Sequence, residues 1–217
     1  LVGHEKTIWL LSMMLLKDVL PHAYLFHGPT RIGKSTLAIN LAMAINCLDQ
    51  KEGNPCGQCR QCERINSGNH PDVQIIEVLP GDETSMVRNE VGIEQIRDIQ
   101  HSSSLKPYEG HYRIFILPEI SLLSPQASNA LLKLLEEPPD KVIFLLTSAN
   151  LESVIPTILS RCQIISTNRI PHDQISDHLT RHFDIGPDDA TYIARISQGQ
   201  IGWAIEAATN TELLEDY

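Results

Sequence analysis

Short apolar runs alternate with stretches of helical spacing along most of the chain. The runs that predict buried strands cover residues 24–26, 73–78, 113–117, 142–146 and 163–166. Between them, apolar residues at spacings of three and four predict helices over residues 34–46, 91–102, 124–137 and 155–159. Strands that alternate with helices in this way predict an α/β fold with a mainly parallel, five-stranded sheet.

The pattern changes near residue 168. Three helical stretches follow without a strand between them, over residues 171–183, 187–197 and 201–214. We therefore expect an α/β domain over residues 1–168 and a small helical domain over residues 169–217. A helix within residues 1–20 is expected before the first strand, and the polar stretch 80–89 predicts a loop.

Composition narrows the class of protein. The chain has 217 residues, of which 42% are hydrophobic and 20% charged, as in globular proteins. A net charge of −10 argues against a basic nucleic-acid-binding protein that acts alone. No apolar run reaches about 18 residues, and no cleavage site follows the apolar residues 7–16, so we expect a cytoplasmic location. Because the chain starts at Leu1 and stops within helix-like sequence, a further domain is expected outside it.

A phosphate-binding loop lies between the first predicted strand and the helix that follows it. Residues 28–35 fit the pattern G-x-x-x-x-G-K-[ST], in which glycines let backbone N–H groups face a phosphate. The lysine can reach the β- and γ-phosphates and the serine hydroxyl can hold Mg²⁺, which makes ATP with Mg²⁺ the candidate ligand. The alternative is a chance glycine-lysine-serine turn before a helix. The candidate nucleotide-binding residues are Gly28, Pro29, Thr30, Arg31, Ile32, Gly33, Lys34, Ser35 and Thr36.

Four of the five cysteines lie close together in the sequence, at Cys47, Cys56, Cys59 and Cys62. Four thiolates satisfy tetrahedral zinc and leave no open position for catalysis, so we expect a structural Zn²⁺ site. An iron–sulfur cluster and a disulfide pair are the alternatives. The clustering also fits a reducing cytosol.

The order of several motifs resembles the bacterial DNA polymerase III clamp-loader subunits of the AAA+ class, over residues 1 to about 209. The resemblance implies an AAA+ phosphate-loop domain with an inserted zinc module, a helical lid domain and a C-terminal collar domain that is absent here. It also implies partners: gamma/tau and delta subunits, the sliding clamp, and primed DNA reached through the assembled ring. The motifs are residues 22–26, the phosphate loop, the four cysteines, residues 70–72, residues 129–139 and residues 160–162.

Three departures from the family pattern separate two types of subunit. The third predicted strand is followed by Pro118 and Glu119, where the ATP-hydrolysing gamma/tau motor has an Asp-Glu pair for Mg²⁺. Gly202 stands at the place of the lid arginine, and Arg31 replaces a glycine of the phosphate loop. These departures favour a delta-prime type with weak or no ATP hydrolysis over a gamma/tau-type motor. Glu119 is kept as a catalytic candidate, although a structural role is at least as well supported.

Arg161 is the expected active group, because the resemblance makes it an arginine finger that reaches a neighbouring subunit's nucleotide. Its alternative is an ordinary ion pair. Residues 148–150 fall in the family's nucleotide-sensing region or form a plain loop, and Cys162 is expected to be a packing residue. A zinc-dependent nucleic-acid-binding module is disfavoured, because acidic residues offset the basic ones around the cysteines: Lys51, Arg60 and Arg64 against Asp49, Glu52 and Glu63.

Overall fold

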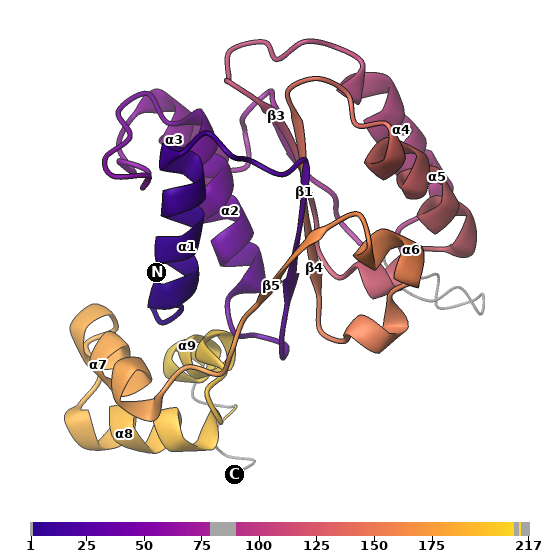
Figure 1. The fold of residues 1–217 in the computed structure, drawn as a ribbon. Coiled ribbons are helices and arrows are strands. Elements are labelled where there is room, and N and C mark those ends of the chain that lie inside the picture. Colours follow the sequence, from indigo (N-terminus) through magenta and orange to yellow (C-terminus); the bar gives the residue numbers. More distant parts are fainter. Residues whose placement is uncertain (1, 79–89, 211–212, 214–217) are drawn as a thin grey trace.

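In the computed structural model, the described residues form one sheet of five parallel strands with helices on both faces (Figure 1). The structure describes residues 2–78, 90–210 and 213; the predicted loop over residues 80–89 lies outside them. The strand order is β2-β3-β4-β1-β5, and every pairing is parallel, which confirms the predicted fold class. The strands are β1 (Ala23–His27), β2 (Val73–Ile75), β3 (Arg113–Leu117), β4 (Val142–Ser148) and β5 (Gln163–Ser166).

Alternate residues of each strand supply two separate cores. Leu25 and Phe144 face one side, whereas Phe26 and Leu145 face the other, and all four are fully buried. The first side is covered by α4 (Ile93–Ser103), α5 (Pro125–Glu136) and α6 (Pro156–Leu159). The second is covered by α1 (Glu5–Leu16), α2 (Lys34–Asn46) and α3 (Arg60–Asn66). Short 3₁₀ turns follow β3 and β4, at η1 (Ile120–Leu122) and η2 (Leu151–Ser153).

Several elements differ from the sequence-based expectation. β2 ends at Ile75 instead of residue 78, because it is an edge strand that, within the described part of the chain, pairs with β3 alone. β4 runs two residues further than predicted, through Ser148, because β1 continues to pair with it there. The helix α3 was not predicted at all. The cap of α5 is as expected, since the Ser124 hydroxyl accepts a hydrogen bond from Ala127 N.

The C-terminal helices α7 (His172–His182), α8 (Pro187–Ile196) and α9 (Ile201–Thr209) have a hydrophobic cluster of their own, which includes Ile175, Leu179 and Ile193. The cluster also takes in Ile170, which precedes α7. α9 ends at Thr209 because Asn210 is extended. The domain division at residue 168 stays a prediction. No helix in the described part of the chain is long and apolar enough to span a membrane.

Candidate functional site

The predicted phosphate loop connects β1, near the middle of the sheet, to α2. Gly28 has a φ of 155°, and a Cβ there would lie 2.3 Å from Thr167 O, so a larger residue does not fit. Gly33 has a φ of 96°, in the left-handed region that glycine tolerates best. Arg31 is also left-handed, with a φ of 59°, at the position where the family pattern has glycine.

Two side chains and a backbone N–H group donate hydrogen bonds to the carbonyl oxygens of the phosphate loop. Lys34 Nζ donates to Gly28 O and Pro29 O, both at 2.8 Å. Gly202 N donates to Arg31 O at 2.7 Å, and His4 Nε2 donates to Ile32 O at 2.8 Å. These bonds hold the loop in shape without a ligand, which is the preorganisation that anion binding requires.

The start of α9 packs directly on the loop. A Cβ at Gly202 would lie 3.0 Å from Arg31 O, so the absence of a side chain permits this close approach. One turn further along α9, Glu206 pairs with the Arg31 guanidinium at 2.6 Å. The place of the family's lid arginine is therefore occupied by a backbone contact, and Arg31 is paired with a carboxylate.

A pocket of about 370 Å³ opens in front of the loop, at the carboxyl ends of the strands. Burial lowers the pKa of Lys34, although the negative charge of Glu119 opposes this effect. The structure thus brings the predicted phosphate-binding residues together with the end of β3 and the start of α9. The lining residues are Thr30, Arg31, Gly33, Lys34, Ser35, Thr36, Pro118, Glu119, Thr147, Ile201, Gly202 and Ile205.

The Glu119 carboxylate is bonded to other parts of the chain. It accepts hydrogen bonds from Ser121 Oγ at 2.6 Å and from Ala149 N at 3.0 Å, and Ser148 Oγ lies 3.2 Å away. Its own N–H donates to Thr147 Oγ1 at 3.0 Å. The carboxylate therefore links the ends of β3 and β4, which supports the structural role for Glu119 over the catalytic one. A sensing role for residues 148–150 stays a prediction.

The parallel strands all begin at one side of the sheet, here called the amino edge, and all end at the other, the carboxyl edge. Arg161 lies at the amino edge, whereas the phosphate loop lies at the carboxyl edge. It precedes β5, whose residue Gln163 is level with Tyr24 of β1, whereas Gly28 follows the far end of β1. At about 3.3 Å per residue, the four residues from Tyr24 to Gly28 span about 13 Å. The Arg161 side chain is one-third exposed and pairs with Glu136 at 2.7 Å. Arg161 is therefore remote from its own phosphate loop.

The four clustered cysteines meet in space as predicted, with their Sγ atoms all within 4.8 Å of one another. The sulfurs of Cys47 and Cys59 are 3.9 Å apart, near the separation of about 3.8 Å expected for two ligands of tetrahedral zinc. Backbone N–H groups donate to sulfur within the cluster, among them Cys56 N to Cys47 Sγ and Cys59 N to Cys56 Sγ, each at 3.3 Å. All five cysteines are free thiols in this structure, and the meeting of four sulfurs favours a metal site over a disulfide pair.

The thiols of the cluster differ in how readily they ionise, because burial raises the pKa of Cys47 and Cys62. Burial opposes ionisation of Cys59, but N–H groups near its sulfur prevail and lower its pKa to about 6. Cys162 lies outside the cluster and packs against the core, where burial raises its pKa to about 12. That location fits the packing role expected for Cys162.

The cysteine module is tied to the sheet by residues whose role the sequence did not reveal. Asp72 is buried ahead of β2, and its carboxylate accepts hydrogen bonds from Tyr108 N, Glu109 N and Gly110 N at 2.7 to 2.8 Å. The turn that it holds presents the Glu109 carboxylate to two arginines of α3, Arg60 and Arg64. The signal was the His70-Pro71-Asp72 motif, which marked the segment without showing its partner.

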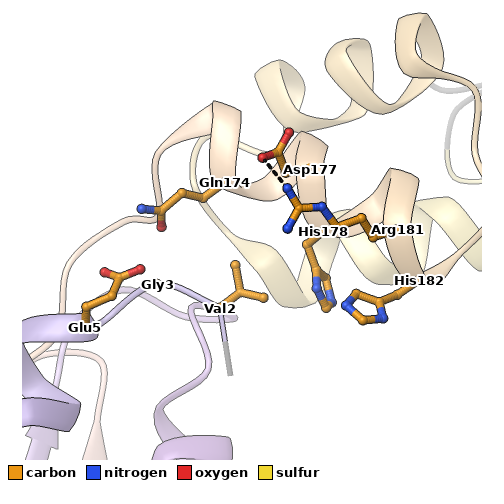
Figure 2. A pocket seen from close by; sticks show the side chains of 8 residues that line it. All are labelled: Val2, Gly3, Glu5, Gln174, Asp177, His178, Arg181 and His182. Carbon is orange, nitrogen blue, oxygen red and sulfur yellow. Dashed lines mark hydrogen bonds and ion pairs between the residues drawn. The ribbon is translucent and has the colours of Figure 1, made fainter.

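A second hollow, of about 450 Å³, lies between residues 2–5 and α7 (Figure 2). His178 and His182 project side by side from α7, with ring centroids 4.6 Å apart, and Arg181 pairs with Asp177 at 3.2 Å. The buried Gln174 Oε1 has no hydrogen-bond partner among the described residues. This hollow shares no lining residue with the phosphate-loop pocket.

The sheet order, the loop after β1 and the helical part packed on that loop define a phosphate-loop protein of the AAA+ type. A family model described as "DNA polymerase III, delta subunit" matches residues 3–171. The chain belongs to this family.

Relatives of both subunit types are similar to the chain. The DNA polymerase III subunit delta' of Bacillus subtilis is 33% identical over 210 residues, covering 97% of this chain and 60% of the relative. The tau/gamma subunit of Haemophilus influenzae is 36% identical over 178 residues, covering 82% of this chain and 25% of the relative. The chain thus spans between a quarter and three fifths of these relatives, and identity does not separate the two types.

Solved structures agree on the fold. A gamma-subunit-related protein of Thermotoga maritima has a TM-score of 0.63 at 20% identity, covering 94% of this chain and 57% of that one. The RuvB Holliday junction branch migration motor of the same organism has a TM-score of 0.60 at 19% identity, covering 96% and 61%.

Proposed function

We propose that this chain is a delta-prime-type subunit of the DNA polymerase III clamp loader, which helps to place the sliding clamp on primed DNA. Its contribution to ATP hydrolysis is Arg161, offered to the nucleotide of a neighbouring gamma/tau subunit. The observation that carries this proposal is the position of Arg161 at the amino edge of the sheet, away from its own phosphate loop and partly exposed. A guanidinium there would neutralise charge that develops on the transferred phosphoryl group.

The chain's own pocket supports nucleotide binding better than hydrolysis. The phosphate loop is intact and preorganised, and Lys34 lines the pocket. A motor also needs a carboxylate for Mg²⁺ and a second cation. Here Pro118 follows β3, Glu119 is bonded to the end of β4, and Gly202 has no side chain. These features favour the delta-prime type over the gamma/tau-type motor.

The test is ATP turnover by a loader reconstituted from the full-length protein with gamma/tau and delta subunits, clamp and primed DNA. Arg161→Ala should lower turnover by about 10³–10⁵-fold while the complex stays assembled. Arg181→Ala is the matched control, because Arg181 is an exposed arginine in an ion pair on α7. Unchanged turnover with Arg161→Ala would refute the proposal.

We also infer that the four cysteines hold structural zinc. The closed set of four sulfurs, their spacing and the bonds from backbone N–H groups support it. Elemental analysis should find one zinc per chain in the wild type and in Cys162→Ala, but a loss of metal and a lower melting temperature in Cys56→Ser. Iron in place of zinc, or unchanged metal in Cys56→Ser, would count against it.

A further inference from the structure

The Arg161 guanidinium is bonded to residues of two helices, α5 and α6. α6 packs against α5, and Arg161 follows α6 by two residues. Glu136, the last residue of α5, reaches Arg161 Nη2 with a carboxylate oxygen at 2.7 Å. On its other side, Arg161 Nη1 donates to the carbonyl of Thr157 at 2.9 Å and lies 3.2 Å from Ser160 Oγ.

From this geometry we infer that Glu136 is a positioning residue, which orients Arg161 toward the nucleotide of the neighbouring subunit; the inference rests on the proposed function. Two contacts on different nitrogens fix the plane of a guanidinium, whereas one contact leaves it free to rotate. A long side chain that is already ordered loses less conformational entropy when it reaches its target. The remaining N–H groups of the guanidinium stay available for phosphate oxygens.

The Arg161–Glu136 ion pair lies at the surface, so its role in catalysis can be tested without a large effect on folding. Both side chains are partly exposed, at 32% for Arg161 and 47% for Glu136, and exposed ion pairs contribute little to stability. Glu137 provides a matched control, because it is the next residue and, among the described contacts, its carboxylate has no ion pair. Removal of either carboxylate should therefore leave folding and assembly almost unchanged.

The experiment compares Glu136→Ala, Glu136→Asp, Glu137→Ala, Arg161→Ala and the double variant Glu136→Ala/Arg161→Ala in the reconstituted loader. Glu136→Ala should lower kcat for ATP by about three- to tenfold with little change in KM, because it disorders a group that acts in the transition state. Glu136→Asp should recover part of the loss, and Glu137→Ala should behave as the wild type. In the Arg161→Ala background, the loss caused by Glu136→Ala should disappear.

The outcomes separate the inference from the proposal beneath it. If Glu136→Ala causes the same loss with and without Arg161, its role is structural and the inference is wrong. Unchanged or faster turnover in Glu136→Ala means that the ion pair holds Arg161 in a resting position and does not orient it for catalysis, which also overturns the inference. If Arg161→Ala itself leaves turnover unchanged, the proposed function fails, and the positioning role falls with it.

Discussion

The two edges of the sheet use the same kinds of polar residue for different purposes. At the carboxyl edge, Lys34 and Glu119 line a pocket that can admit a ligand. At the amino edge, Asp72 is buried with backbone N–H groups and Arg113 as partners, and no ligand is needed to satisfy it. A charged residue in this fold therefore indicates a ligand site only where its partners leave space for one.

Arg161 is the exception at the amino edge. Unlike Asp72, it is partly exposed, and its carboxylate partner, Glu136, is more exposed still. An arginine with spare donors on the surface suits a target outside its own chain. The contrast between the edges gives testable expectations: changes at the buried amino-edge residues should cost folding stability, and changes at the pocket should cost binding.

Among the changes in stability and binding that this contrast predicts, the largest is expected for Asp72→Ala. It would remove the shared acceptor of three backbone N–H groups and the carboxylate partner of the largely buried Arg113 guanidinium, which should lower the free energy of unfolding by about 3–5 kcal/mol. Chemical denaturation of the two proteins measures this difference. Ser35→Ala at the other edge is the control and should stay close to the wild type. A loss below about 1 kcal/mol for Asp72→Ala would contradict the role assigned to this carboxylate.

The second-largest effect is expected at Lys34 in the phosphate-loop pocket. Lys34→Ala should weaken ATP binding by about a hundredfold, or about 2.7 kcal/mol, because it removes the cation nearest the phosphates. Assembly of the loader should be unaffected, since among the described contacts the Lys34 ammonium bonds to its own loop alone. Calorimetric titration with ATP and gel filtration of the complex report the two quantities. An assembly defect without a binding defect would reverse the assignment of this edge.

The elements of the sheet and the loop could be predicted from the sequence because they depend on local patterns. The apolar runs of β1, β3 and β5 and the spacing of Gly28, Gly33 and Lys34 are such patterns. The carboxylate contacts could not be predicted, because they join residues far apart in the chain. Asp72 meets Glu109, and Glu119 meets Ala149, only after the strands have paired.

The contacts between the C-terminal helices and the phosphate loop could not be predicted from the sequence either. The sequence showed that Gly202 stands where the family pattern has an arginine, but not that α9 presses its backbone against Arg31. It also gave no sign that Glu206 would neutralise Arg31. Such contacts depend on how the helices pack against the loop, and apolar periodicity carries no information about that packing.

Gly202→Arg tests whether the missing arginine can simply be restored. We expect that it cannot, because a Cβ at this position would already lie 3.0 Å from Arg31 O and 3.3 Å from Arg31 Cβ. Overpacking of this kind should lower stability by about 1–3 kcal/mol and should also weaken ATP binding, since the loop must move. Thermal unfolding and ATP titration measure both. Tighter ATP binding at unchanged stability would show that the loop tolerates a side chain here.

The smallest effect is a pH dependence that arises at the amino edge. His70 Nδ1 accepts a hydrogen bond from Asp72 N at 3.0 Å, so Nε2 carries the proton and donates to Gln61 Oε1. Burial lowers the pKa of His70 from its ordinary value, although Asp72 and Glu109 oppose this effect. The neutral ring therefore contributes stability that is complete above about pH 6.5 and is lost as the pH falls through the pKa of the folded state.

The pKa of Asp72 is lowered as well, and its contribution to stability changes at a lower pH than that of His70. Burial opposes its ionisation, but the three backbone N–H groups and Arg113 lower its pKa, so its contribution is lost only below about pH 4. The free energy of unfolding should therefore fall first below pH 6.5, and His70→Gln should flatten this first slope alone. Both proteins should be compared at equal zinc content between pH 7.5 and 4.5. Identical slopes would mean that His70 is not the group that titrates.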